Sequence, residues 1–307
     1  MQGHRHFVPG MLGEFMKFTG SIYRPPLEAS TQLLQVTSGC AHNQCTFCTM
    51  YKNDPFHVED LGQIEKDVLE LKQGRKTLKR IFLVNGDAFV LSARRLKAIS
   101  DLLIKHFPML ETITMYASIS NVRSKTDQEL AMLKEARIND LWMGIETGHG
   151  PTLDHMNKGH HIEEAYDQLE RLNKAGIRHL HGLMIGIAGK GMGQENALAT
   201  AQLLNKTKPA LIWICTTGIF EGSTLGQQVE SGLYTPASER EVLEEEISLL
   251  NHLDLDQVPF YSNHPTNTSK FYGILPADKD RMVRHIQATM DKMTEEALNS
   301  PGTRNSL

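Results

Sequence analysis

The stretch LLQVTSGCAHNQCTFCTMYK, residues 33–52, joins a short apolar run to a loop that carries three of the four cysteines of the chain. The run LLQVT has the length and composition of a buried β-strand. Cys40, Cys45 and Cys48 follow it with the spacing C-x4-C-x2-C, which lets three thiolates meet on one side of a tight loop. Three sulfurs suit either zinc with a fourth ligand or an iron-sulfur cluster with one iron left open. We therefore expect a metal centre directly after this strand.

Structural zinc is one interpretation of this loop, with the three cysteines and His42 as ligands. A fortuitous cluster is another alternative. The other histidines do not form a zinc-ligand spacing with a second cysteine pair; they include His4, His6, His160 and His161. In a reducing compartment, clustered cysteines are metal ligands or catalytic groups more often than disulfides.

Length and charge set broad limits on the protein. A chain of 307 residues with 40% hydrophobic content can bury a large core. A formal net charge of -4 and a pI near 6.4 give no basic footprint for a nucleic-acid backbone, so a polynucleotide partner is not favoured. The N-terminal segment lacks the continuous apolar core of a signal peptide, and no run reaches the roughly 18 apolar residues of a membrane span. We expect a cytoplasmic globular protein without membrane contact.

Strands and helices alternate along the chain from the cysteine loop onward. Six apolar runs are predicted as strands, and each precedes a segment with helical periodicity. The pairs of strand and helix are 33–37 with 58–74, 80–88 with 92–107, 112–120 with 126–137, 140–147 with 162–176, 179–189 with 195–208, and 210–220 with 238–253. Such alternation predicts right-handed crossovers and a parallel sheet, here an α/β fold with a partial (β/α)6 TIM-type barrel. In such barrels the chemistry lies on the loops that follow the strands, where the cysteine loop is also expected.

The barrel accounts for most of the chain. We expect an N-terminal extension over residues 1–32, the barrel over 33–275, and a C-terminal helix and polar tail over 276–307. Nothing in the sequence resembles a second domain, a repeat or a low-complexity tract.

Together, these motifs resemble the radical S-adenosylmethionine (SAM) superfamily over about residues 33–275. Members of that family hold a [4Fe-4S] cluster on three cysteines after the first strand, commonly spaced C-x3-C-x-aromatic-C. Here Phe47 fills the aromatic position, and the departure is one extra residue between Cys40 and Cys45. The resemblance implies that Cys40, Cys45 and Cys48 bind the cluster and that its open iron chelates SAM. One-electron cleavage of SAM then yields a 5'-deoxyadenosyl radical, and the electron is expected from a flavodoxin- or ferredoxin-type donor.

The second predicted strand ends in VNGDA, where the family has a Gly-Gly-Glu-like turn that hydrogen-bonds the SAM amino group. The resemblance implies this role for Asn85, Gly86 and Asp87. Gly86 permits a close backbone approach, and Asp87 or backbone carbonyls accept from an ammonium group. An ordinary βα turn is the alternative, because Asn-Gly-Asp is common turn chemistry.

Hydroxyl side chains follow along the third predicted strand. By alternation, Tyr116, Ser118 and Ser120 share one side of this strand, and their hydroxyls are candidates to reach the SAM ribose.

The segment from GIETG to MNKG, residues 144–159, looks like that of coproporphyrinogen-oxidase-like and Elongator-like radical SAM proteins. It implies that Glu146 takes the ribose hydroxyls and that Lys158 pairs with the SAM carboxylate. A solvent-facing Glu and a surface Lys are the alternatives. On the fifth strand, GLMIGIAG resembles the adenine-binding strand of the family through the backbone of Gly186, Ile187 and Ala188, although apolar residues of this kind are usually core.

Two later segments are candidates to face the substrate. FEGSTL, residues 220–225, resembles a G-T-x-L turn of the same branch, and YSNHPTN, residues 261–267, returns the chain over the barrel mouth. His264 is the candidate for a substrate contact or proton donor, and Asn267 lies beside it. A loop histidine with a satisfied hydrogen bond is an equal alternative.

The lack of further cysteines and of a cobalamin domain limits the classes of reaction that we expect. Only Cys215, inside the apolar run IWICTTG, remains outside the cysteine loop, so thiols are too few for an auxiliary cluster, and there is no room for a cobalamin domain. We expect an oxidoreductase-type radical SAM enzyme that abstracts hydrogen from a fairly small substrate. The alternatives are a non-enzymatic zinc or iron-sulfur barrel protein, and a coproporphyrinogen-type oxidative decarboxylase.

Overall fold

The computed structural model of the protein describes residue 16 and residues 18–304. His4, His6 and most of the N-terminal segment used above to judge targeting lie outside these residues. The strands of the central sheet are β1 (Gln32–Gln35), β4 (Arg80–Val84), β5 (Thr112–Ala117), β6 (Ile138–Glu146), β7 (Arg178–Ile185), β8 (Leu211–Thr216), β9 (Val258–Tyr261) and β10 (Tyr272–Leu275). A separate ribbon pairs β2 (Thr37–Ser38) with β3 (His57–Val58).

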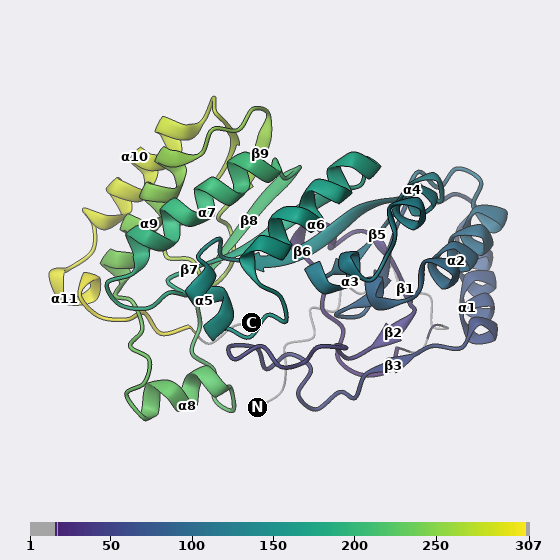
Figure 1. Ribbon diagram of the computed structural model, residues 1–307, viewed down its shortest axis with the longest axis horizontal. Coiled ribbons are helices and arrows are strands. Elements are labelled where there is room, and N and C mark those ends of the chain that lie inside the picture. Colours follow the sequence, from purple (N-terminus) through teal and green to yellow (C-terminus); the bar gives the residue numbers. More distant parts are fainter. Residues whose placement is uncertain (1–15, 17, 305–307) are drawn as a thin grey trace.

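Helices pack around this sheet (Figure 1). The α-helices are α1 (Leu61–Gly74), α2 (Ala93–His106), α3 (Ile119–Arg123), α4 (Asp127–Glu135), α5 (Gly150–His155), α6 (Ile162–Ala175), α7 (Gly193–Thr207), α8 (Thr224–Glu230), α9 (Glu239–His252), α10 (Lys279–Met290) and α11 (Glu295–Leu298), and two 3-10 turns are η1 (Pro26–Glu28) and η2 (Ala88–Val90). Within the described part of the chain, no helix combines the length and the apolar character that a membrane crossing requires.

The eight strands follow one another in the order β1-β4-β5-β6-β7-β8-β9-β10. Those from β1 to β9 in this order are parallel, and β10 is antiparallel to β9. The two outermost strands, β1 and β10, are not neighbours in the sheet, so the barrel is open on one side. This architecture confirms the predicted α/β partial barrel.

All six predicted pairs of strand and helix are present, but several strand ends differ. The strand expected to reach residue 120 ends at Ala117, because Ser118 caps α3: its Oγ accepts from the Asn121 N–H over 3.2 Å. The alternation that placed Ser120 on a strand was therefore wrong. The short strands β9 and β10 were not predicted. The boundaries expected for the extension, the barrel and the C-terminal segment stay predictions.

The buried side chains of the strands alternate between two cores. One set packs against the helices in a large cluster that includes Leu83 and Leu141. The opposite set lies on the inner face of the curved sheet and includes Phe82 and Trp142, with residues of the N-terminal segment such as Phe18 packed against it. The inner face of the barrel is therefore filled over part of its length.

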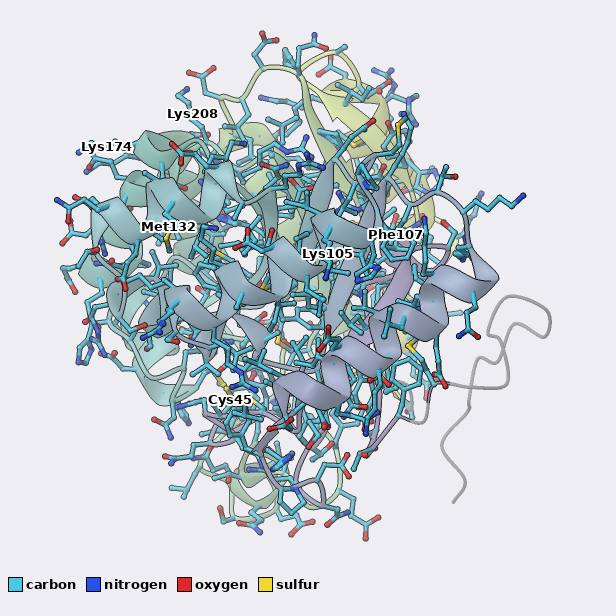
Figure 2. All side chains as sticks on the ribbon, turned by 90° about the vertical axis from the view of Figure 1, so that its right-hand side faces the viewer. Cys45, Lys105, Phe107, Met132, Lys174 and Lys208 are labelled. Carbon is cyan, nitrogen blue, oxygen red and sulfur yellow. The ribbon has the colours of Figure 1, made fainter. Side chains whose placement is uncertain are left out.

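The cysteine loop lies at the carboxyl end of the parallel strands. Figure 2 shows Cys45 at one end of the molecule and Lys174 and Lys208 at the other. Lys174 lies in the last turn of α6, just before β7, and Lys208 ends α7, just before β8. Figure 1 shows the β2–β3 ribbon, α5 and α8 in the lower half of the view. This confirms that the loop follows the strands at the end where such barrels carry their chemistry.

Charged side chains fasten η1 to the strands of the barrel. Glu28 is 2% exposed and accepts from Arg80 Nε over 3.0 Å and from Trp142 Nε1 over 2.9 Å. Arg80 also donates to Asp140 over 2.6 Å, and Arg178 donates to the other oxygen of Asp140 over 2.7 Å. These bonds join the N-terminal segment to the first residues of β4 and β7.

Replacing Glu28 by Ala is expected to lower the free energy of unfolding by about 3 kcal/mol, because the Trp142 N–H and the Arg80 guanidinium lose their acceptor in a largely buried place. Glu111→Ala is the control and is expected to cost little, since its ion pair with Lys79 is exposed to solvent. Urea denaturation of both variants measures the difference. Equal stability of the two variants would contradict the expectation.

Candidate active site

The cysteine loop is closed at its base by the β2–β3 ribbon. Gly39 has a φ of +65°, and a side chain there would lie 2.5 Å from the carbonyl oxygen of Asp54, so only glycine fits. Within the loop, the Asn43 amide donates to the carbonyl of Tyr51 over 2.9 Å. All three cysteines are free and half-buried. The chain thus turns back on itself and carries three thiols on one short loop.

Two other segments hold this loop in place. The N–H of Thr46 donates to the carbonyl of Met156, after α5, over 3.1 Å. The carbonyl of Thr46 accepts from the N–H of Leu225, at the start of α8, over 2.8 Å. The segment 220–225 singled out in the sequence therefore reaches the cysteine loop.

Positive charge surrounds Cys45. Burial raises the pKa of the Cys45 thiol, but Lys158 and His42 outweigh burial and leave this pKa below its ordinary value. The interaction with Cys45 is the main reason why the pKa of His42 is raised, and His42 Nε2 also lies 2.6 Å from the carbonyl oxygen of Asn157. Because the thiolate is the form that binds metal, these neighbours favour metal binding at Cys45.

The donor set fits an iron-sulfur cluster. Burial raises the pKa of the Cys40 and Cys48 thiols. Across residues 16 and 18–304, no three His, Cys, Asp or Glu side chains converge as the ligands of a single metal ion do. In a cubane cluster each cysteine binds a different iron, so its ligands do not have to converge on one point. Three thiols on one loop are what a cluster with one open iron requires.

A buried ion pair lies next to the cysteines. Lys158 Nζ is 2.8 Å from Glu146 Oε1, and the two side chains are 15% and 12% exposed. Lys158 Nζ also lies over the ring of Phe47, 5.8 Å from its centroid. Although burial lowers the pKa of Lys158, Glu146 and Cys45 hold it above its usual range. The structure thus brings together Glu146, Lys158 and the cysteine loop, and the alternative of a free surface lysine was wrong.

The end of β4 carries unsatisfied polar atoms. Asn85 is fully buried, and neither its amide oxygen nor its amide nitrogen has a hydrogen-bond partner among the described residues. A side chain on Gly86 would lie 2.4 Å from the Tyr51 ring, so this glycine is required for packing. Burial raises the pKa of Asp87 to about 6. Because orphaned buried groups are costly, the Asn85 amide fits a polar ligand.

Of the three hydroxyl residues expected along β5, Ser118 and Ser120 already form hydrogen bonds, and Tyr116 packs through its ring. Tyr116 packs edge-on against Phe82 on the inner face of the sheet, with ring centroids 5.4 Å apart. Ser118 caps α3, and the Ser120 hydroxyl donates to the carbonyl of Gly159 over 2.8 Å. The strand alternation that grouped these three residues does not exist, and their contact with ribose stays a prediction.

The turn after β7 forms hydrogen bonds with Glu245 and Tyr234. Gly186 has a φ of +78°, and its N–H donates to Glu245 over 3.1 Å. Ile187 is fully buried, and Ala188 is half-buried. The carbonyls of Gly186 and Ile187 accept from the Tyr234 hydroxyl. Contact of residues 186–188 with adenine stays a prediction.

His264 forms a hydrogen bond within its own loop, as expected for the alternative of a loop histidine without a role in the reaction. It is 9% exposed, its Nδ1 lies 2.6 Å from the Thr266 hydroxyl, and its ring packs edge-on against Trp213. Burial lowers the pKa of His264 to about 4, so the ring is neutral near pH 7. A substrate contact or proton transfer by His264 stays a prediction.

A cleft borders the carboxyl end of β8. Its volume is about 430 Å³, and it lies between residues 265–268 and residues 293–304, with Glu239 at its side. Asn267 lines the cleft, and its Oδ1 accepts from the Thr216 N–H at the end of β8 over 2.7 Å. Arg304, which donates to Glu239, also lines it. This volume suits a small-molecule site.

Two residues that the sequence reasoning did not place near the site lie beside it. Tyr51 is 4% exposed, and its hydroxyl has no partner among the described residues. Cys215 packs, as Phe47 does, against an apolar cluster that includes Met184 and Ile187, so it lies closer to the site than its place on a later strand suggested. The signal for Cys215 was strand alternation, which puts it on the inner face, whereas no sequence signal singled out Tyr51.

Comparisons with known proteins agree with this geometry. A family model described as the radical SAM superfamily matches residues 34–203. The heme chaperone HemW of Bacillus subtilis (strain 168) is 26% identical over 172 residues, which are 54% of this chain and 45% of HemW. An uncharacterized protein of Methanocaldococcus jannaschii is 24% identical over 254 residues, 77% of this chain and 74% of the relative. The chain thus spans less than half of HemW.

Solved structures share the fold. Coproporphyrinogen III oxidase (HemN) from Escherichia coli, a radical SAM enzyme, gives a TM-score of 0.56 at 16% identity over 72% of this chain and 52% of HemN. The radical SAM methyltransferase TsrM from Kitasatospora setae gives 0.53 at 14% identity over 66% of this chain and 39% of TsrM. Because the family model covers more than half of the chain, the protein belongs to the radical SAM superfamily, whose cofactors are a [4Fe-4S] cluster and SAM.

Proposed function

We propose that this enzyme reductively cleaves SAM to a 5'-deoxyadenosyl radical, which abstracts a hydrogen atom from a small-molecule substrate. The observation that carries the proposal is the convergence of Cys45, Phe47, Glu146 and Lys158 at the carboxyl end of the sheet. An electron donor of the flavodoxin or ferredoxin type, a cytoplasmic location and the oxidoreductase class belong to the same proposal, because the cleavage consumes one electron.

Cys40, Cys45 and Cys48 are the proposed cluster ligands. The closed loop holds the three thiols together, and Lys158 and His42 favour the thiolate of Cys45. The cluster, when bound, supplies the electron and one open iron that chelates SAM.

Glu146 and Lys158 are the proposed ligands of the SAM ribose and carboxylate. The Lys158 ammonium has three N–H donors, of which Glu146 accepts one, so donors remain for a ligand carboxylate. Phe47 supplies a ring beneath the ammonium group.

Backbone and amide groups complete the proposed SAM site. We assign the SAM amino group to Asn85, Gly86 and Asp87 at the end of β4, because the Asn85 amide has no hydrogen-bond partner among the described residues. Residues 186–188 offer the backbone after β7 to adenine. Tyr116, Ser118 and Ser120 stay candidates for ribose contacts, since a hydroxyl that donates one hydrogen bond still accepts another.

The cleft at the end of β8 is the proposed substrate opening. Hydroxyl and amide side chains line it, among them Thr266 and Asn267, and His264 lies beside them. Such a lining suits a polar molecule of small size. We propose His264 as a neutral hydrogen-bonding contact near this opening, because its lowered pKa disfavours a charged role.

Lys158→Ala is expected to weaken SAM binding about tenfold to a hundredfold, which corresponds to roughly 1.5 to 3 kcal/mol, because a charge-assisted contact is lost. Lys174→Ala, which removes an exposed lysine, is the matched control and is expected to bind SAM as the wild type does. Equilibrium dialysis under anaerobic conditions at equal iron content measures the affinity, and release of 5'-deoxyadenosine on reduction measures cleavage. If the two variants bind SAM equally, Lys158 is not a ligand; if the wild type releases no 5'-deoxyadenosine, the proposed function is wrong.

Cys45→Ala is expected to lose the cluster, whereas Cys215→Ala is expected to keep about four irons per chain, because three loop thiols suffice for a cluster with one open iron. Anaerobic reconstitution followed by iron analysis and absorption spectra compares the two variants. Iron loss from Cys215→Ala would instead identify this residue as a fourth ligand and leave no open position for SAM.

A further inference from the structure

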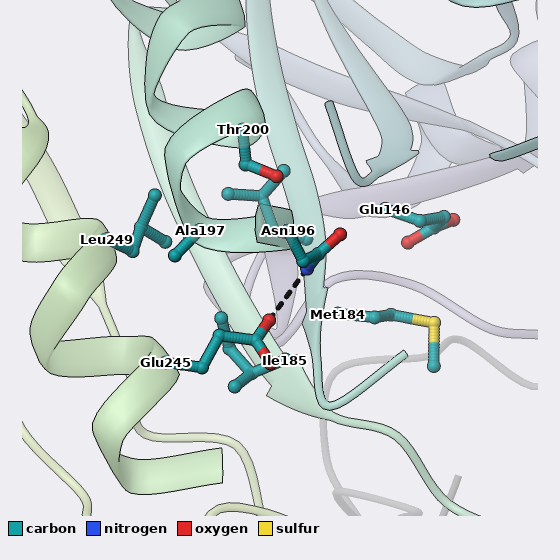
Figure 3. A pocket seen from close by; sticks show the side chains of 9 residues that line it. Glu146, Met184, Ile185, Asn196, Ala197, Thr200, Glu245 and Leu249 are labelled. Atoms are coloured by element: carbon teal, nitrogen blue, oxygen red, sulfur yellow. Dashed lines mark hydrogen bonds between the residues drawn. The ribbon is translucent and has the colours of Figure 1, made fainter. Parts of the chain in front are cut away.

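A buried carboxyl group, whose pKa burial raises to about 8, lies behind the carboxyl ends of β6 and β7. Glu245, in α9, is 1% exposed, and its two oxygens accept hydrogen bonds from separate parts of the chain. Oε1 accepts from Asn196 Nδ2 over 2.7 Å, and Oε2 accepts from the Gly186 N–H over 3.1 Å. Figure 3 shows the bond between Glu245 and Asn196 together with Glu146. The pocket that these side chains line has no room for a water molecule, so direct hydrogen bonds replace water there.

Asn196 also forms a hydrogen bond with the turn after β6, so it links that turn to Glu245. Its Oδ1 accepts from the Thr147 hydroxyl over 2.5 Å. One helical turn further along α7, the Thr200 hydroxyl accepts from the Gly148 N–H over 2.9 Å. A side chain on Gly148 would lie 2.5 Å from a backbone carbonyl of α7, so the helix touches the turn directly. The turn that begins at Glu146 is therefore held by α7.

The β-ladder alone does not hold this turn. The register between β6 and β7 shifts between Gly144 and Glu146. Glu146 has a φ of +64°, a left-handed conformation that is unfavourable for a residue with a side chain unless its surroundings impose it. On the β7 side, the Tyr234 hydroxyl lies 3.0 Å from the Gly186 carbonyl oxygen, so that turn is bound at its N–H and at its carbonyl.

We propose that Glu245 and Asn196 are positioning residues for SAM, which tie the turn carrying Glu146 to the turn carrying residues 186–188. The inference rests on the proposed SAM site. Glu245 and Asn196 act through hydrogen bonds to the backbone and side chains of these turns, and they do not touch the ligand. Turns that are fixed before binding lose less conformational entropy when SAM binds, so the two residues raise its affinity.

The test compares Glu245→Met with Glu245→Gln. Met keeps the length of the side chain and removes both acceptors. Gln keeps an acceptor for the Gly186 N–H and offers its NH2 group to the Asn196 oxygen once that amide turns over. We expect SAM to bind about tenfold more weakly to Glu245→Met, and within about threefold of the wild type to Glu245→Gln, at equal iron content. In cluster-free protein, amide hydrogen exchange over residues 183–189 is expected to be faster in Glu245→Met.

The outcomes separate this inference from the proposed function. If the wild type and Glu245→Met bind SAM equally well, the carboxyl group serves stability alone and the inference is overturned, while the proposed function stands. Equal losses in the Met and Gln variants overturn it as well. If Glu245→Met does not fold, Thr147→Val and Thr147→Ser replace it in the test. Weaker SAM binding by Thr147→Val but not by Thr147→Ser supports the inference, and equal SAM binding by the two variants overturns it. Absence of SAM binding by the wild type contradicts both proposals.

Discussion

The ion pair between Lys158 and Glu146 is the interaction on which the candidate site depends. Both side chains are mostly buried, and an isolated charge there would cost several kcal/mol in lost hydration. Each ion therefore requires the other, and the pair fixes the segment after α5 against the end of β6. Cys45, whose thiol pKa is lowered, adds negative charge near the same ammonium group. The lysine thus offsets the Glu146 carboxylate and also stabilises the nearby thiolate of Cys45.

The side chains of the site come from strand ends, but helices set their orientation. Glu146 leaves the regular ladder in a left-handed conformation, and α7 approaches the next residues so closely that only Gly148 fits. The cysteine loop is held in the same way, since Thr46 is bound both after α5 and at the start of α8. A parallel sheet brings the loops to one end, and contacts behind the sheet then fix how each loop faces its neighbours.

Local patterns account for what the sequence predicted, and tertiary contacts account for what it did not. The six strand and helix pairs were predicted because apolar runs and helical periodicity are local signals. The four-residue strands β9 and β10 were missed, since their extended form comes from pairing with β8 and with each other. The cysteines, Glu146 and Lys158 were found by motif spacing. Glu245 stands in the run EEE, which is typical of a solvated helix face, and only the fold shows that it is buried.

The inner face of the barrel is arranged in layers along the strands, which explains why a site exists at one end only. At the middle of β6 and near the start of β7, Trp142 and Leu180 belong to a packed apolar cluster. Two residues further along, Gly144 and Gly182 stand opposite each other in register. A side chain on Gly144 would lie 2.3 Å from Glu146 Oε1 and 3.2 Å from Lys158 Nζ, so the absence of a side chain makes room for the ion pair above. The layer below is closed by packing, and a ligand must therefore reach the ion pair from the carboxyl end of the strands, where the cysteine loop lies.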